Sequence, residues 1–175
     1  MFHDEVHRPR DHRLGHEVEP KVSGEVTEGE REDRSGPAVA EELRVRGFEV
    51  VSTGMVSDVQ DLIEESLKAL CFVAQLVVTT GGTGIAERDV TPEATRAVCS
   101  KLIDGVAEKM RADGLAATPT AILSRGICGV YGRSLILNLP GSPSGAIESL
   151  AAVADVLPHA IDLLEGKTEH EERIN

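Results

Sequence analysis

The chain has 175 residues, of which 41% are apolar, enough for one domain with a core and too few for a large second one. The formal net charge is −12, from 18 basic and 30 acidic side chains, which excludes a broad basic face for nucleic acid. A small anionic ligand is still compatible with this charge, because backbone amides and helix starts bind phosphate without many lysines.

The cysteines and the hydropathy indicate the expected compartment. Cys71, Cys99 and Cys128 are odd in number and far apart, so we expect reduced, mostly buried thiols. No apolar run approaches the roughly 18 residues that span a bilayer, and the N-terminal residues lack the apolar stretch of a signal peptide. These features predict a cytoplasmic protein that does not enter a membrane.

The N-terminal residues are rich in charge and poor in apolar side chains, so we expect a mobile tail over residues 1–27. Four of the six histidines lie there, in two pairs spaced four apart, as metal ligands on a helix are. The competing interpretation is a solvated tail, because a helix here would have no core to pack on. The histidines are His3, His7, His12 and His16.

After Pro37 the apolar residues become periodic, and helices alternate with strands. This alternation predicts a three-layer α/β/α domain with a mostly parallel sheet. The expected helices cover 37–46, 58–72 with a Ser57–Gln60 capping box, 93–100 with Thr91 as N-cap, 103–115, and 144–164 with a break at Pro158; the expected strands cover 48–53, 75–80, 120–124 and 134–139, with a glycine-bearing connection at 126–132.

The strongest motif is the glycine-rich stretch that follows the buried strand 75–80. Glycines allow a sharp turn and bring N–H groups close to an anion, and threonine hydroxyls add donors. A simple tight turn is the alternative. The stretch is neither a Walker A loop nor a dinucleotide fingerprint, because the required spacing is absent. The candidate phosphate-binding residues are Thr80, Gly81, Gly82, Thr83 and Gly84.

Two aspartates stand at the starts of expected helices. Asp89 follows the glycine loop, and a carboxylate beside bound phosphates usually needs a cation between them, so Asp89 is a candidate Mg²⁺ ligand. Asp58 follows the strand 48–53 and is expected at the same edge of the sheet. For both residues, helix capping is the alternative role. Arg88 and Arg125 are candidates for pairing with phosphate, although isolated arginines are more often surface residues.

A second glycine turn, at 140–143, connects the strand 134–139 to a helix. Ser142 there either caps the helix or donates to a second phosphate. Loops after parallel strands can lie at one sheet edge, where ligands usually bind. The candidate residues of this loop are Gly141, Ser142 and Pro143.

These motifs resemble the Mog/MoaB family of molybdenum-cofactor biosynthesis proteins, which share the molybdopterin-binding fold. The matching stretches are residues 29–37, 79–94, 120–125 and 138–143, in family order and spacing. The resemblance covers about 28–166, with a charged C-terminal tail at 167–175. It implies that Asp58 and Asp89 are the functional aspartates, that 81–84 bind nucleotide and pterin together with Arg88, and that 141–143 form a second pocket wall.

The departure from the family lies before Gly29. The family has a core strand ending in Ser-Asp, whereas residues 20–27 here contain few apolar side chains and no Ser-Asp. We therefore expect the N-terminal strand to be degenerate or missing. Either 21–26 form a poor substitute strand, or the protein is a destabilised or inactive relative.

The resemblance implies an enzyme that adenylylates molybdopterin with ATP and Mg²⁺ and releases pyrophosphate. It also implies a homo-trimer or hexamer and a partner protein that inserts molybdate. One rival is a catalytically silent molybdopterin-binding paralogue or scaffold, which the missing Ser-Asp favours. The other is a nucleotide hydrolase of the competence-damage type, which the motif at 30–37 disfavours.

Overall fold

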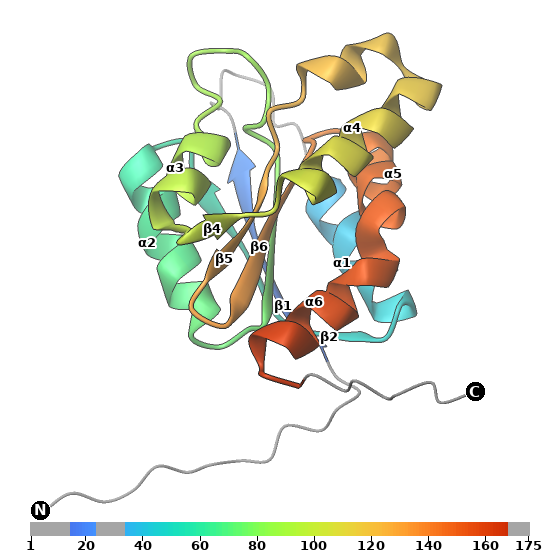
Figure 1. The fold of residues 1–175 in the computed structure, drawn as a ribbon. Coiled ribbons are helices and arrows are strands. Elements are labelled where there is room, and N and C mark those ends of the chain that lie inside the picture. Colours follow the sequence, from blue (N-terminus) through green and yellow to red (C-terminus); the bar gives the residue numbers. More distant parts are fainter. Residues whose placement is uncertain (1–14, 24–33, 168–175) are drawn as a thin grey trace, which may run out of the picture.

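A six-stranded sheet forms the middle layer of the molecule, with helices on both faces (Figure 1). The computed structural model describes residues 15–23 through their backbone and residues 34–167 with their side chains. The strand order is β2-β1-β3-β6-β5-β4. The strands are β1 Gly15–Ser23, β2 Phe48–Ser57, β3 Leu76–Thr80, β4 Lys101–Leu102, β5 Cys128–Tyr131 and β6 Ser134–Leu139.

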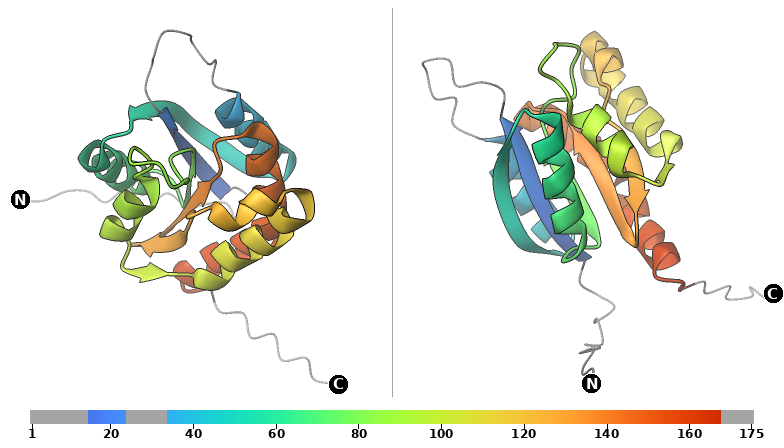
Figure 2. Two further views of the ribbon diagram at one scale, coloured as in Figure 1. Left: turned by 90° about the horizontal axis from the view of Figure 1, so that it is seen from above. Right: turned by 90° about the vertical axis from the view of Figure 1, so that its left-hand side faces the viewer.

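The helices divide into two groups that cover opposite faces of the sheet (Figure 2). The larger core cluster joins one face to α1, α4, α5 and α6, and the smaller one joins the other face to α2 and α3. This arrangement confirms the predicted three-layer α/β/α class. The helices are α1 Ser35–Val45, α2 Gln60–Cys71, α3 Thr91–Val98, α4 Asp104–Ala117, α5 Pro143–Val153 and α6 Leu157–Leu164, with 3-10 turns η1 Pro119–Leu123 and η2 Ala154–Val156.

Strands β3 and β6 form the centre of the sheet and are buried along their whole length. They pair in parallel from Leu76 with Leu135 to Thr80 with Leu139. Their apolar side chains alternate between the two core clusters, as a strand covered on both faces requires. The two strands therefore end side by side, at the edge where the two predicted glycine loops begin.

Strand β1 lies inside the sheet and pairs in parallel with both β2 and β3. The predicted tail over 1–27 is thus wrong across Gly15–Ser23, and the N-terminal strand is present rather than missing. It also begins earlier than the substitute strand considered at 21–26. Its backbone pairs with a neighbour on each side, so its N–H and C=O groups find partners although its sequence is polar.

The irregular pairing of β1 reflects its composition. Its register against β2 shifts between Glu17 and Val18, which leaves an extra residue on β2. Pairing with β3 includes Glu17, Val18 and Lys21, but neither Glu19 nor Pro20. Pro20 has no N–H to donate, so a weakened ladder at this position is expected. The strand is present but, as predicted, degenerate in sequence.

The remaining predictions for the two ends of the chain concern residues outside the described part. These are the rest of the predicted N-terminal tail, with three of its histidines, and nearly all of the tail at 167–175. His16 lies in β1, so the interpretation of this residue as a metal ligand on a helix, which was weighed against a solvated tail, is wrong.

The second half of the sheet is antiparallel, which the sequence did not indicate. β5 pairs antiparallel with β6, and β4 pairs antiparallel with β5. The expected connection at 126–132 contains β5, and the expected strand at 120–124 lies largely in the 3-10 turn η1. Glycine at position 129 fits this packing, because a Cβ there would lie 2.5 Å from Cys99 Sγ. The position of β5 therefore depends on packing against a residue that is distant in the sequence.

Two predicted helix caps do not form. α2 begins at Gln60 after Val59, without a side-chain cap, so the Ser57–Gln60 capping box is absent. Val90, and not Thr91, precedes α3; the Thr91 hydroxyl donates instead to the Gly81 carbonyl at 3.1 Å. Tertiary contacts with the glycine loop thus replace the local cap.

The three cysteines are free, and Cys128 is buried while the others are half-buried. Burial raises the pKa of Cys71 and Cys128 to about 12 and that of Cys99 to about 11. Free thiols that are buried or half-buried agree with the expected mostly buried thiols. Within residues 15–23 and 34–167, no helix is long and apolar enough to cross a membrane.

Candidate functional site

The two glycine loops meet at the carboxyl edge of the sheet, at the end of the molecule that faces the reader in the left panel of Figure 2. The Gly81 N–H donates to the Leu139 carbonyl at 3.1 Å. A Cβ on Gly141 would lie 3.1 Å from Gly81 Cα, so a side chain there would crowd the first loop. The predicted convergence of the two loops is confirmed.

The first loop turns through Gly81 and Gly82, whose φ angles of 93° and 63° favour glycine. It is fastened to the start of α3, because Thr91 donates from its hydroxyl to Gly81 and from its N–H to Gly82 at 3.2 Å. Thr80 is fully buried below the loop, where its hydroxyl accepts from Ser35 at 3.5 Å. Of the five residues predicted for this loop, Thr80, Gly81 and Thr83 are buried, and Gly82 and Gly84 are half-buried.

A cavity of about 390 Å³ opens beside the two loops. Of the predicted residues, Thr83, Gly84, Gly141 and Ser142 line it. Its other walls come from α4, η1 and α5. η1 overlaps the matching stretch 120–125, whereas no motif indicated α4 or the body of α5, which reach the site through tertiary packing. Contributors that the sequence did not reveal include Ile85, Ala107, Met110, Arg111, Asn138 and Glu148.

Ser142 occupies the N-cap position of α5, yet its side chain makes no capping hydrogen bond. Gly145 leaves room for this hydroxyl, because a Cβ there would lie 2.6 Å from Ser142 Oγ. Pro143 is the first residue of the helix. Capping, one of the two predicted roles of Ser142, is thus wrong, and the hydroxyl lines the cavity.

An acidic group lies next to the loops. Asp58, after β2, is close enough to Arg88 and Asp89 for their charges to affect its titration. Burial raises the pKa of Asp58, the Asp89 charge raises it further, and Arg88 lowers it. Asp58 Oδ1 is buried and, within the described part of the chain, has no hydrogen-bond partner. Such an atom normally has a partner, so Asp58 Oδ1 is a candidate ligand-binding atom.

Asp89 is placed by a short turn. Its N–H donates to the Ala86 carbonyl and its Oδ2 accepts from the Ala86 N–H, both at 2.9 Å. A Cβ on Gly84 would lie 2.7 Å from Oδ2, so the glycine makes room for the carboxylate. Neither α2 nor α3 has a side-chain cap. The alternative capping roles of Asp58 and Asp89 are therefore wrong.

The donor set of this acidic group fits Mg²⁺. Mg²⁺ is usually held by one or two carboxylates plus substrate phosphates and water. Asp58 and Asp89 provide two carboxylates, one with an unpartnered buried oxygen. The described residues contain no cluster of three or more metal-ligating side chains, so phosphate and water would complete the coordination.

Asn138 anchors the site from below and was not predicted. It is 1% exposed, and its Nδ2 donates to Thr79 Oγ1 at 3.0 Å and to Thr95 Oγ1 at 2.9 Å. These bonds join β6 to β3 and α3 beneath the loops. In the sequence it begins the matching stretch 138–143 and is the one amide side chain within an apolar strand, but no role was assigned to it.

The arrangement defines a class of protein: an α/β domain whose glycine loops, helix starts and carboxylates surround a site for phosphorylated ligands. Residues 21–159 match the model of a family described as "Probable molybdopterin binding domain". The chain belongs to this family.

Curated relatives and solved structures agree with this assignment. A molybdopterin adenylyltransferase of Helicobacter pylori is 45% identical over 149 residues, covering 83% of this chain and 85% of that protein. One from Escherichia coli K12 is 40% identical over 162 residues, with 83% of each chain covered. The crystal structure of the molybdopterin biosynthesis enzyme MoaB from Thermus thermophilus is 47% identical, with a TM-score of 0.80 and coverage of 87% and 98%.

Proposed function

We propose that this protein is a molybdopterin adenylyltransferase of molybdenum-cofactor biosynthesis. The observation that carries the proposal is the meeting of two glycine loops with an unpartnered buried oxygen of Asp58 at one sheet edge. Relatives of 40% and 45% identity that are named for this activity support it.

In the proposed reaction, a phosphate oxygen of molybdopterin attacks the α-phosphorus of ATP. One P–O bond forms, the bond between the α- and β-phosphates breaks, and pyrophosphate leaves. The attacking phosphate is largely ionised at neutral pH, because its second pKa is about 6. No general base is therefore needed, and catalysis consists of orientation and charge neutralisation.

The chain's own residues divide this work. The amides and hydroxyls of 81–84 and the exposed loop at 141–143 would bind phosphates, and Arg88 would add positive charge. The cavity lined by Ala107 and Met110 offers an apolar surface for a flat ring. Asp58 and Asp89 would hold Mg²⁺, which when bound neutralises phosphate charge.

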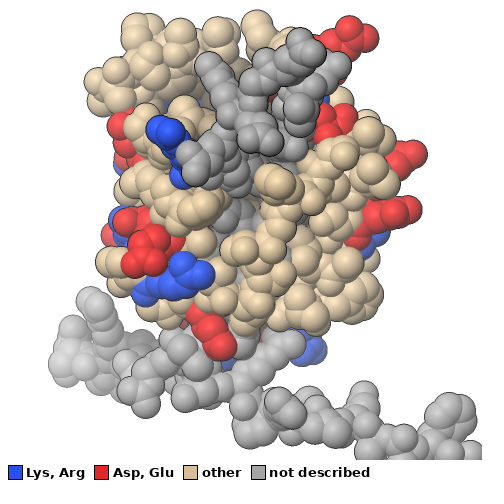
Figure 3. All heavy atoms as spheres, turned by 180° about the vertical axis from the view of Figure 1, so that it is seen from behind, with Lys and Arg blue, Asp and Glu red and all other residues tan. Residues whose placement is uncertain are grey.

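We also propose a homo-oligomer, a trimer or hexamer, and docking of a partner that inserts molybdate. The surface over β2 carries few charged side chains, which supports self-association (Figure 3). On this outermost strand, Glu49 is the one charged residue, and Val51 is 41% and Met55 70% exposed. A sheet edge with little charged protection favours pairing with another chain. A cytoplasmic location remains a prediction.

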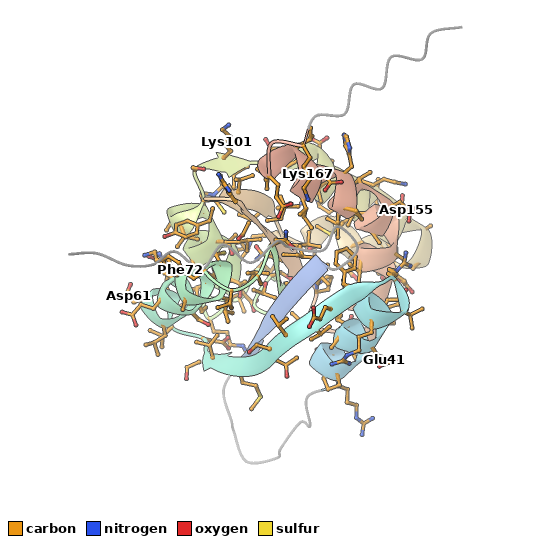
Figure 4. All side chains as sticks on the ribbon, turned by 90° about the horizontal axis from the view of Figure 1, so that it is seen from below. Glu41, Asp61, Phe72, Lys101, Asp155 and Lys167 are labelled. Carbon is orange, nitrogen blue, oxygen red and sulfur yellow. The ribbon has the colours of Figure 1, made fainter. Side chains whose placement is uncertain are left out.

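The test is to incubate the purified full chain with molybdopterin, ATP and Mg²⁺ and to follow adenylylated pterin and pyrophosphate. Asp58→Asn and Asp89→Asn should each lower the rate about 100-fold or more, because charge placement in the transition state is lost. Asp61→Asn is the matched control, since Asp61 points outward from α2 (Figure 4).

Three results are distinguishable in this assay. Product that both site variants abolish and the control retains supports the proposal. Molybdopterin binding without product would instead establish the silent paralogue, which the sequence of β1, without a terminal Ser-Asp, favours. Hydrolysis of the nucleotide without pterin would indicate the competence-damage type of activity.

A further inference from the structure

Arg125 contacts three separated parts of the glycine loop and the segment after it. Its Nε donates to the Gly84 carbonyl at 2.5 Å, and its Nη2 donates to the Asp89 carbonyl. Its Nη1 pairs with the Glu93 carboxylate on α3. In addition, the Arg125 N–H donates to the Thr83 carbonyl at 2.9 Å. All three guanidinium nitrogens are therefore occupied by the protein itself.

These contacts close the segment 84–89 into a ring. Gly84 and Asp89 stand at its two ends, and the same planar group binds both of their carbonyls. The ends also lie close together, since a Cβ on Gly84 would come within 2.7 Å of Asp89 Oδ2. A rigid fork of donors holds such a geometry, whereas a flexible ammonium satisfies one carbonyl at a time.

The charge of Arg125 is already balanced by Glu93, so a phosphate is not needed to neutralise it. This distinguishes it from Arg88, which is exposed and affects the titration of Asp58. Arg125 thus has neither of the roles considered from sequence, phosphate pairing or an idle surface residue. Its bonds go to the backbone that carries Asp89.

We propose that Arg125 is a positioning residue, which holds the loop 84–89 so that the Asp89 carboxylate stands beside Asp58 to receive Mg²⁺. This inference rests on the proposed function and deepens it. Arg125 contacts neither substrate nor metal; it acts through the loop. Its loss should therefore lower the affinity for Mg²⁺ more than it changes the rate at saturating Mg²⁺.

The test compares Arg125→Lys and Arg125→Gln with wild type in two measurements. In Mg²⁺ titrations of adenylylation, half-saturation should rise at least about ten-fold, equivalent to about 1.4 kcal/mol, with Lys less affected than Gln. In amide hydrogen exchange, peptides covering 81–93 should exchange faster while those of β5 and β6 stay unchanged.

Arg46→Lys is the matched control, because Arg46 also uses its guanidinium in an ion pair, with Glu42 at 2.7 Å, at the opposite end of α1 from the site. It should change neither measurement. An unaltered Mg²⁺ curve in Arg125→Gln would overturn the inference. Faster exchange throughout the sheet would also overturn it, by showing a general loss of stability.

The exchange measurement does not depend on turnover. If the wild-type chain makes no adenylylated product, the proposed function fails, while loop exchange and Mg²⁺-dependent ATP binding by calorimetry still test Arg125. If the wild type is active and Arg125→Gln matches Arg46→Lys in both measurements, only the positioning role fails.

Discussion

The parallel part of the sheet consists of two strand pairs, β3 with β6 and β1 with β2, whose positions are determined in different ways. β3 and β6 are apolar, buried along their length and regular in register. β1 combines charged residues with Pro20, and its neighbour β2 is exposed over most of its length. The comparison teaches that side-chain burial fixes β3 and β6, whereas backbone pairing places β1. The site depends on both, since Asp58 follows β2 and Asp89 follows β3.

The largest expected effect on stability comes from disrupting the buried strands β3 and β6. Val77→Asp places a charge at a fully buried position in β3 and should cost about 4 kcal/mol or more of unfolding free energy, enough to abolish folding. Val73→Asp, at a position 60% exposed just before β3, should change stability by about 0.5 kcal/mol or less. Urea unfolding followed by circular dichroism measures both. A folded Val77→Asp protein would refute specification of these strands by burial.

A smaller effect of opposite sign is expected in β1. Pro20→Val restores a backbone donor to an interior strand and should stabilise the protein by about 1 kcal/mol. Pro119→Val is the control, because Pro119 begins the turn η1 and does not lie in a strand whose neighbour would accept a hydrogen bond from its N–H. The melting temperatures of both variants, compared with that of the wild type, test this prediction. A loss of stability in Pro20→Val would show that the proline is needed for the course of β1.

The smallest effect concerns pH. Burial raises the pKa of folded Asp58 above the ordinary 3.8, so the folded protein binds this proton more tightly than the unfolded chain does. The contribution of Asp58 to stability is therefore favourable at low pH and is lost as pH rises from 3.8 through the raised pKa.

Asp58→Asn cannot ionise, so it should be more stable than wild type at pH 7, with a difference that shrinks toward pH 4. Melting temperatures without Mg²⁺ across this range measure the difference. Asp61→Asn, in the first turn of α2, should give no such gain, because an acidic side chain is favourable at a helix start. A pH-independent gain in Asp58→Asn would exclude ionisation as its cause.

Local features of the sequence were sufficient for β3, β6 and the two loops. A short apolar run followed by glycines constrains the chain within a few residues, through burial and the φ angles at Gly81 and Gly82. The same reasoning correctly brought the loops together, because adjacent parallel strands end at one edge. The roles of the individual site residues remain predictions.

Tertiary structure alone decided the rest. β1 was not recognised because its position depends on hydrogen bonds from two neighbouring backbones, which leave no hydrophobic pattern. β5 depends on the fit of Gly129 against Cys99, and the cavity depends on helices that arrive by packing. Arg125 looked like an isolated charge because its partners lie 32 to 41 residues away. Sequence periodicity records only what neighbouring residues share, whereas these features are contacts between segments that meet only in the folded chain.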